Sequence, residues 1–284
     1  MNDTTSTHDI KDDSPSVLVL DSKHPGLQDQ NYVQRRSMFF NVSRDYRLNN
    51  KGLPKVEYTE EENRIWSLIM SKLNAVHSKK ACKVYLEGKR LLHFNEQHMP
   101  QLHELDQILK RQHNIGLAPA EGLLDTRTFN RYLSNRVMPC TQFLRHGSNP
   151  EYTPEPDAVH DVIGHVPPLM NKDYVKLIEL FGKGVLQASD EQLDAWARMY
   201  WFTIEFGLIE EDGELKAFGA GLLSSYGEME YCFSNKVKHK LFNIKEVMDT
   251  PYDTTCMQDV LFVIPSMEFL YNEIQCLIDQ QCKS

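Results

Sequence analysis

The stretch PDAVHDVIGHVPPL, residues 156–169, contains two histidines that could bind a metal ion. His160 and His165 stand five residues apart, Asp161 follows the first, and Gly164 precedes the second. Two imidazoles and one carboxylate on one face of an octahedral ion leave three positions open. This arrangement suits non-haem Fe(II) that must bind dioxygen and substrate together. The alternative is an ordinary helix end that carries two polar side chains.

The spacing of five is a weaker signal than the residue types. Five residues turn an α-helix by about 500°, or ~140° net, so His160 and His165 would not share a face of a straight helix. Gly164 and the prolines that follow Val166 could end the helix and bring His165 back. The chain has no H-x-x-x-H, H-x-D or H-x-E pattern, which excludes the zinc-protease signature and the usual opening of the 2-oxoglutarate oxygenase triad.

A carboxylate ligand would have to come from another element. In YWFTIEFGL, residues 200–208, Glu205 lies among aromatic and aliphatic neighbours. A carboxylate is costly to bury there unless it is paired or bound to a metal. The other interpretation is a glutamate at the wet edge of a helix, and the residues alone leave both open. His93, His98 and His103 are also spaced by five, but their polar stretch predicts surface histidines.

Composition excludes several classes of function. The 284 residues include 31 basic and 40 acidic side chains, for a net charge of −9. No basic block occurs, so we expect no nucleic-acid or membrane partner. No window approaches the ~18 apolar residues of a membrane span, and the polar, acidic start is not a signal peptide. Six scattered cysteines without a CxxC pattern predict reduced thiols and a cytoplasmic location.

The elements that would position these residues are mostly helices. We expect a disordered segment over residues 1–20 and a single domain over 21–284, mainly α with small β content. Predicted helices follow a capping box at Thr59 and Glu62, follow Pro100, run from about residue 189 to a C′ glycine at Gly207, and close the chain over 266–281. The Asp212–Gly213 step between short apolar runs predicts a β-hairpin.

Several long motifs together resemble one family. They are HPGLQDQNYVQRR, VEYTEEENRIW, CTQFLRHGSNPEYTPEPDAVHDVIGHVPPL, MYWFTIEFGL and KAFGAGLLSSYGEMEYC. Their order and separations resemble those of the pterin-dependent aromatic amino acid hydroxylases over roughly residues 24 to 272. The resemblance implies the catalytic-domain fold of that family, with one Fe(II) bound by His160, His165 and Glu205.

The resemblance also implies residues that bind an amino acid substrate. Arg145 matches the arginine that grips the substrate carboxylate, and Asp157 matches the acidic residue that orients it. This would be a bidentate guanidinium–carboxylate clamp. Thr153 and Ser224 match positions lining the amino acid site, and Trp201 matches an aromatic wall beside the substrate ring. Without the resemblance, a buried structural ion pair and plain core packing would be the preferred interpretations.

A second set of residues matches the family's tetrahydropterin site. In EGLLDTRTF, residues 121–129, one aromatic ring would stack on the pterin while nearby backbone bonds its edge. The implied pterin contacts are Gly122, Leu124, Phe129, Asp161 and Ala197. The family usually has glutamate where Asp161 stands, so a carboxylate that bonds the pterin through water is one methylene shorter here.

The resemblance predicts hydroxylation of L-phenylalanine to L-tyrosine with dioxygen, by a phenylalanine 4-monooxygenase of the short bacterial type. Such a chain would be a monomer or dimer rather than the tetramer formed through a C-terminal tail. Tryptophan hydroxylases tend to have phenylalanine where Trp201 stands, and tyrosine hydroxylases tend to have an acidic residue where Thr254 stands. Tryptophan or tyrosine as substrate stays an alternative. So does a non-catalytic protein whose site is closed by zinc.

Overall fold

The computed structural model describes residues 20, 24–49, 52–151, 153 and 155–281. The segment predicted to be disordered, residues 1–20, lies outside these ranges except for Leu20, and so does Cys282. The predicted division into one domain over 21–284 stays a prediction.

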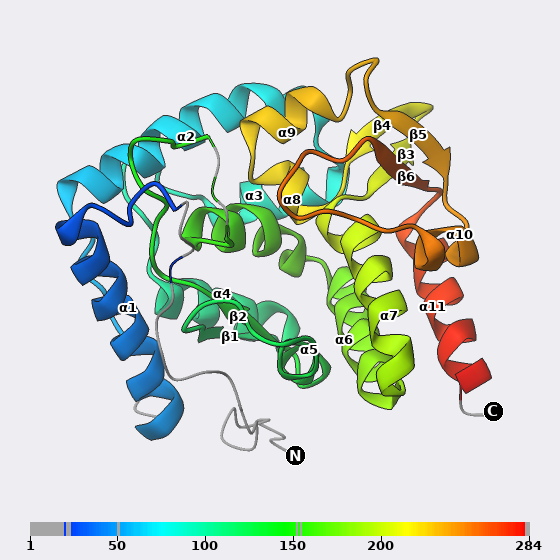
Figure 1. Ribbon diagram of the computed structural model, residues 1–284, viewed down its shortest axis with the longest axis horizontal. Coiled ribbons are helices and arrows are strands. Elements are labelled where there is room, and N and C mark those ends of the chain that lie inside the picture. Colours follow the sequence, from blue (N-terminus) through cyan, green and yellow to red (C-terminus); the bar gives the residue numbers. More distant parts are fainter. Residues whose placement is uncertain (1–19, 21–23, 50–51, 152, 154, 282–284) are drawn as a thin grey trace.

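Helices make up most of the described chain, as predicted (Figure 1). The α-helices are α1 (Gln30–Asn49), α2 (Glu60–Lys80), α3 (Lys83–Leu92), α4 (Leu102–His113), α5 (Thr126–Ser134), α6 (Lys172–Gln187), α7 (Leu193–Tyr200), α8 (Ala220–Leu223), α9 (Tyr226–Tyr231), α10 (Ile244–Asp249) and α11 (Met267–Gln281). Two π-helical turns, η2 (His160–His165) and η5 (Trp201–Glu205), and two 3-10 turns, η3 (Pro167–Met170) and η4 (Asp190–Gln192), complete the set.

The strands form two small sheets. Strands β1 (Gly116–Pro119) and β2 (Val137–Cys140) pair in parallel, and α5 lies between them in the sequence. The other sheet has the order β4-β3-β6-β5, built from β3 (Leu208–Glu211), β4 (Glu214–Ala217), β5 (Lys238–Leu241) and β6 (Val260–Ile264). It lies at one end of the molecule, above helices α6, α7 and α11 (Figure 1).

Local signals place several elements where the sequence predicts them. The Thr59 hydroxyl accepts from the Glu62 backbone N–H at 3.2 Å, and the Glu62 carboxylate accepts from the Thr59 N–H at 2.8 Å, so the capping box opens α2. Helices α4 and α11 bury their predicted apolar faces, except that Ile108 and Leu277 are only half-buried. The predicted hairpin joins β3 to β4, with positive φ at both Asp212 and Gly213.

The predicted helix that ends at Gly207 differs from expectation in two ways. It is not one α-helix, because a 3-10 turn, an α-helix and a π-turn follow one another in η4, α7 and η5. Gly207 does end it, but without the positive φ of a C′ glycine. A Cβ at Gly207 would lie 2.3 Å from the Thr203 carbonyl oxygen, so close backbone approach is what requires glycine there.

Close glycine contacts seat η2 and η3 in the core. A Cβ at Gly164 would lie 2.7 Å from the Ala220 carbonyl oxygen, and one at Gly88 would lie 1.8 Å from the Pro167 carbonyl oxygen. Turn η2 therefore packs directly on α8, and η3 packs directly on α3. All residues of η2 after His160 are buried. The histidine-bearing segment is thus fixed from two sides.

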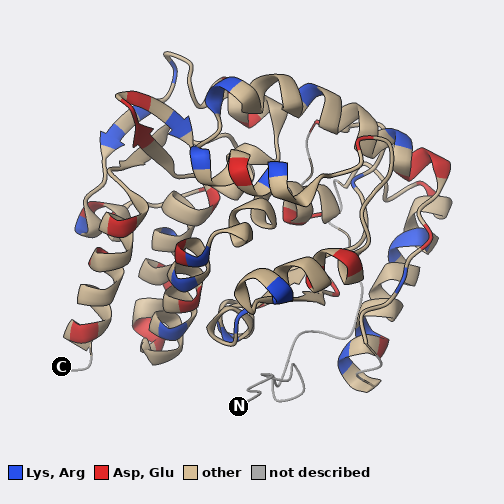
Figure 2. Ribbon diagram, turned by 180° about the vertical axis from the view of Figure 1, so that it is seen from behind, with Lys and Arg blue, Asp and Glu red and all other residues tan. Residues whose placement is uncertain are grey.

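Three further expectations concern the whole molecule. Within the described ranges no helix has the length and apolarity that crossing a membrane requires. The five described cysteines are free thiols. Basic and acidic residues are intermixed on the helices visible in Figure 2, with no single basic face in that view. The expected absence of nucleic-acid and membrane partners stays a prediction.

Candidate metal centre

The two histidines come together because their segment is a π-turn. The Val166 N–H donates to the Asp161 carbonyl oxygen at 3.2 Å, a bond that spans five residues. In such a turn, residues five apart lie about one turn above each other, so His160 and His165 share a side. Gly164 does not end the helical turn as expected, because η2 continues to His165, but the prolines do begin a separate 3-10 turn, η3.

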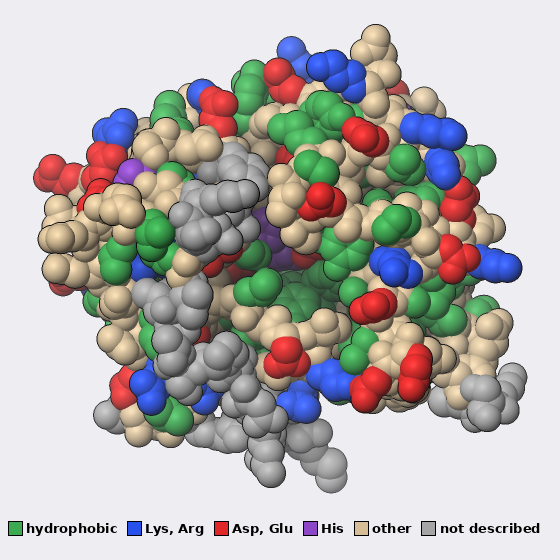
Figure 3. All heavy atoms as spheres, viewed as in Figure 1, with side chains coloured by type: hydrophobic (Ala, Val, Ile, Leu, Met, Phe, Trp, Pro, Cys, Tyr) green, Lys and Arg blue, Asp and Glu red, His purple; other side chains and the backbone are tan. Residues whose placement is uncertain are grey.

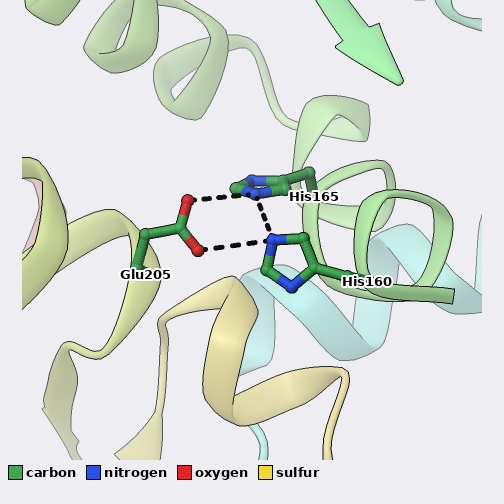
Figure 4. Close-up of side chains that lie close together, drawn as sticks. All are labelled: His160, His165 and Glu205. Atoms are coloured by element: carbon green, nitrogen blue, oxygen red, sulfur yellow. Dashed lines mark hydrogen bonds and ion pairs between the residues drawn. The ribbon is translucent and has the colours of Figure 1, made fainter. Parts of the chain in front are cut away.

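The third predicted ligand comes from the other π-turn. The Phe206 N–H donates to the Trp201 carbonyl oxygen at 2.7 Å, again across five residues. Glu205 ends this turn, and its carboxylate faces both imidazoles (Figure 4). Both segments that carry predicted ligands therefore depart from α-helical geometry at the site itself. Single π-turns within helices occur frequently at functional sites.

The distances at this centre fit one divalent ion. The Nε2 atoms of His160 and His165 are 3.2 Å apart, and Glu205 Oε1 and Oε2 lie 3.2 and 3.5 Å from His165 Nε2 and His160 Nε2 (Figure 4). Ligands about 2.1 Å from a common ion lie roughly 3.0–3.4 Å apart at octahedral or tetrahedral angles. These three are the only cluster of potential metal ligands found among the described residues.

Burial and mutual charge set the protonation of the three side chains. Burial opposes the charge of Glu205, but the two imidazoles hold the pKa of its carboxyl below the ordinary value. Burial lowers the pKa of His160, whereas for His165 the effect of burial is overcome by Glu205, which raises its pKa. A carboxylate that stays ionised beside a neutral imidazole is the form in which these groups bind metals.

Ser224 fixes the tautomer of His160. Its hydroxyl donates its single proton to the Ala220 carbonyl oxygen at 2.8 Å, so toward His160 Nδ1, at 3.1 Å, it can only accept. Nδ1 therefore carries the imidazole proton, and the Nε2 lone pair points to the centre. The sequence comparison predicts Ser224 as a lining residue of the amino acid site and does not reveal this contact. A lone serine after a short helix carries no signal for it.

Arg145 and Asp157 form a buried bidentate ion pair. Arg145 Nε and Nη2 donate to the two oxygens of Asp157 at 2.9 and 2.8 Å, and the side chains are 4% and 0% exposed. Asp157 also accepts from the backbone N–H of His160 at 3.0 Å. Burial opposes the charge of Asp157, yet Arg145 keeps its pKa below the ordinary value. The pair thus ties the predicted substrate clamp to the first predicted ligand.

Of the other predicted substrate residues, Ser224 shares a cavity with Arg145, whereas Trp201 and Thr153 make contacts of their own. Arg145 and Ser224 line one small cavity together with Leu68 and Tyr226. Trp201 stacks on Tyr252, with ring centroids 4.4 Å apart, so it has the core packing that was its simpler interpretation. The Thr153 hydroxyl donates to the Glu155 carbonyl oxygen at 2.8 Å.

The predicted pterin residues other than Asp161 are only half-buried. Phe129 on α5 packs edge-on against Tyr200, with centroids 5.5 Å apart. Gly122 and Leu124 are half-buried in the loop before α5, and a Cβ at Gly122 would have no neighbour within 4 Å. Ala197 is half-buried on α7. In Figure 3, a histidine side chain lies at the bottom of a hollow with apolar and acidic side chains beside it.

Asp161 faces a residue that the sequence analysis did not single out. Its Oδ2 accepts from the Thr141 N–H at 2.6 Å and from the Thr141 hydroxyl at 2.8 Å. Burial raises the pKa of Asp161, although both nearby histidines favour its charged form. One of its oxygens is therefore committed to the chain segment after β2. The alternative histidines do not form a site: His93 and His98 are exposed, and His103 is half-buried.

A helical scaffold with two imidazoles and one carboxylate on facing π-turns defines a mononuclear metal centre of the kind used by oxygen-activating iron enzymes. The profile of the biopterin-dependent aromatic amino acid hydroxylases matches residues 7–281. The chain belongs to this family. The fold expected from the resemblance is therefore confirmed.

Individual relatives include enzymes with different names. The chain is 38% identical over 269 residues to tyrosine 3-monooxygenase of Schistosoma mansoni, covering 93% of this chain and 58% of that protein. It is 39% identical over 251 residues to phenylalanine-4-hydroxylase of Rattus norvegicus, covering 87% of this chain and 55% of that protein. The chain thus spans little more than half the length of these relatives.

A solved relative is phenylalanine hydroxylase from Chromobacterium violaceum, whose structure contains iron(III) and 7,8-dihydrobiopterin. It is similar to this chain with a TM-score of 0.75 and 31% identity, covering 80% of this chain and 84% of that one. Another structure of that enzyme contains cobalt and has a TM-score of 0.74, with the same identity and coverage.

Proposed function

We propose that this protein is an iron- and tetrahydropterin-dependent monooxygenase that hydroxylates L-phenylalanine to L-tyrosine. The observation that carries the proposal is the convergence of His160, His165 and Glu205 within a family that depends on biopterin. These three side chains would hold the Fe(II). When bound, iron and tetrahydropterin together supply the activation of dioxygen, one oxygen atom going to the aromatic ring and the other to the pterin.

The chain itself supplies binding and orientation. Arg145 would take the substrate carboxylate, since its guanidinium is held rigid by Asp157 and by a 3.3 Å contact from Nη1 to the Pro150 carbonyl oxygen. Arginine has five N–H donors, so directions remain beyond those used in these contacts. Its place beside Ser224 in one cavity supports this assignment. Thr153 and Trp201 would line the rest of the amino acid site.

The pterin would lie on the open side of the centre, between α5 and α7. Phe129 offers an aromatic face, and the half-buried backbone at Gly122 and Leu124 offers hydrogen-bonding groups to the pterin edge. Ala197 would make a further contact from α7, and Asp161 would act through water. Closing this side over the cofactor would remove water from the reacting atoms.

Two features favour phenylalanine over the other aromatic substrates. Position 201 is tryptophan, and position 254 is a neutral threonine. The nearest carboxylate in the same loop, Asp253, is turned back onto the chain, because it accepts from the Thr255 N–H at 2.8 Å and from the Thr255 hydroxyl at 2.7 Å. Tyrosine is the second candidate, because relatives of similar identity include tyrosine 3-monooxygenases.

The test is turnover with phenylalanine, tyrosine and tryptophan side by side, with Fe(II) and a tetrahydropterin. We expect tyrosine from phenylalanine as the dominant product, formed only when both cofactors are present. Dominant hydroxylation of tyrosine or tryptophan would overturn the substrate assignment. Metal analysis showing tightly held zinc, together with no pterin-dependent turnover, would favour the non-catalytic alternative.

A further inference from the structure

A further buried histidine lies outside the metal centre and contacts α8. His77, near the end of α2, is 1% exposed and far from the pair in η2 along the sequence. Its Nε2 lies 2.7 Å from the Leu223 carbonyl oxygen. Its Nδ1 lies 2.8 Å from Lys89 Nζ and 3.3 Å from the Tyr85 hydroxyl. Every polar atom of this imidazole therefore has a partner.

These contacts define which ring nitrogen of His77 carries the proton. A carbonyl oxygen can only accept, so Nε2 carries the proton and donates it to Leu223. Nδ1 is then an acceptor, and the Lys89 ammonium donates a hydrogen bond to it. Lys89 is anchored in turn at 2.6 Å on Asn74 Oδ1, and Asn74 Nδ2 donates to Glu96 at 2.7 Å. His77 is thus held as a neutral donor with a fixed direction.

The acceptor of this bond belongs to the peptide that carries Ser224. The Leu223 carbonyl and the Ser224 N–H share one peptide plane. The carbonyl end is held by His77, and the N–H end donates to the Ala220 carbonyl oxygen at 2.9 Å. With both ends fixed, the plane cannot rotate freely. This fixed peptide plane sets the direction of the Ser224 side chain, whose hydroxyl oxygen accepts a hydrogen bond from His160 Nδ1.

We propose that His77 is a positioning residue for the metal centre: through the Leu223–Ser224 peptide it holds the hydroxyl that orients His160. This inference rests on the proposed metal site. Outer contacts of this type fix the ring orientation of a histidine ligand, and their loss typically costs 10–100-fold in metal affinity. His77 acts one peptide further out, and it reaches the site from α2 rather than from α8.

The experiment measures Co²⁺ binding to the metal-free full chain, because Co²⁺ is stable in air and its visible absorption bands report the geometry of its ligands. His77→Phe keeps a planar ring but removes the donor to Leu223. We expect at least about a tenfold rise in the Co²⁺ dissociation constant, with altered absorption bands. His77→Gln places an amide N–H and an amide oxygen where the imidazole has its donor and acceptor, and it should restore the wild-type constant to within about twofold.

A double-mutant cycle with Ser224→Ala separates positioning from general support of the fold. If His77 acts through Ser224, His77→Phe should change Co²⁺ affinity by less than about twofold once Ser224 is alanine. Tyr85→Phe is the matched control, since it removes a contact to the same imidazole but leaves the bond to Leu223. It should leave both the affinity and the absorption bands unchanged.

Several outcomes would overturn the proposal. They are a His77→Phe constant within twofold of wild type, a Gln variant as weak as the Phe variant, and fully additive effects with Ser224→Ala. If His77→Phe does not fold, His77→Met provides the same loss of donor in a flexible apolar side chain. Failure of the wild-type chain to bind Co²⁺ at this site would instead overturn the proposed metal function on which the inference rests.

Discussion

The proposed metal side of the site, His160, His165 and Glu205, and its proposed pterin side, the loop before α5 with Phe129, are built differently. On the metal side, His165 and Glu205 are 3% and 14% exposed, and His160 is held by Ser224 and, through its backbone, by Asp157. On the pterin side, Leu123 is 76% exposed and a Cβ at Gly122 would touch nothing within 4 Å. One side is fixed before anything binds, whereas the other has room around its backbone.

The difference teaches which interactions depend on the fold and which depend on the ligand. Fixed ligands lose little conformational freedom when a metal binds, so their geometry is determined by the protein. An open loop acquires its contacts from the cofactor. Substitutions on the metal side should therefore change metal affinity, and those on the pterin side should change only cofactor dependence.

Removing a predicted ligand should have the largest effect. His160→Ala, His165→Ala and Glu205→Ala should each abolish turnover and weaken Fe(II) or Co²⁺ binding by more than the 10–100-fold expected for an outer contact. The fold should survive, which circular dichroism and thermal unfolding would check. Glu205→Gln is the control that keeps side-chain volume but loses the charge. Near-normal activity of any alanine variant would show that the residue is not a ligand.

Arg145→Lys should come next. Lysine keeps the charge but cannot make the bidentate contact, and the loss should cost roughly 2–5 kcal/mol in a mostly enclosed site. The effect should appear as a higher Michaelis constant for phenylalanine, with a small change for the pterin. Steady-state kinetics at varied phenylalanine would measure it. An unchanged dependence on phenylalanine would leave the ion pair with Asp157 as a structural contact only.

Acid should lower the free energy of unfolding through His77. Burial, and then the charge of Lys89, lower the pKa of His77 to about 3, from an ordinary value of 6.5. The unfolded chain takes up this proton more readily, so the stabilisation is complete above about pH 6.5 and is lost as the pH falls toward about 3. Between pH 7 and 4.5 the free energy of unfolding of the wild type should fall by about 2–3 kcal/mol more than that of His77→Gln, as measured by denaturant titration. Equal losses would contradict the neutral, buried state of His77.

On the pterin side, Phe129→Leu should raise the Michaelis constant for the pterin about two- to tenfold. Leucine keeps apolar volume but lacks the aromatic face, a loss of about 0.5–1.5 kcal/mol. The same variant should bind Co²⁺ as the wild type does. A pterin constant that does not move would exclude Phe129 as the stacking residue.

The smallest effect is expected at Asp161. Glutamate there is longer by one methylene and cannot keep both contacts from Thr141 unless the chain shifts. Asp161→Glu should lower the pterin Michaelis constant and leave phenylalanine dependence nearly unchanged. Thr141→Val, which removes only the hydroxyl donor, is the control. If Asp161→Glu and Asp161→Asn both stay within about twofold, ~0.5 kcal/mol, the pterin role of Asp161 is wrong.

Elements with local signals could be predicted from the sequence. The capping box at Thr59 and the Asp212–Gly213 turn act through contacts within a few residues, so their effect is visible in the sequence itself. The three converging side chains were reached by resemblance, because spacing alone argued against His160 and His165 on one helix face. Helix α6 had available signals, an N-cap at Asn171 and a buried apolar face, and was not predicted.

The remaining features depend on contacts between distant segments. Hydrophobic periodicity does not distinguish a bond across four residues from one across five, so neither π-turn could be predicted. Thr141 and Ser224 act on side chains 20 and 64 residues away. His77 stands in AVHSKK, a polar helix end that suggests exposure. Its contacts are with Leu223 of α8 and with Tyr85 and Lys89 of α3, which are distant in the sequence or carry no local signal for burial.

The π-turns imply that the site depends on the number of residues in each turn as well as on the identity of the ligands. Each hydrogen bond that closes η2 or η5 spans one residue more than the α-helical bond would. If η2 closed instead as a regular α-helix with the same residues, the step of five would turn His165 about 140° away from His160. The chain would then keep all three ligand side chains, but the register that brings them to one ion would be lost.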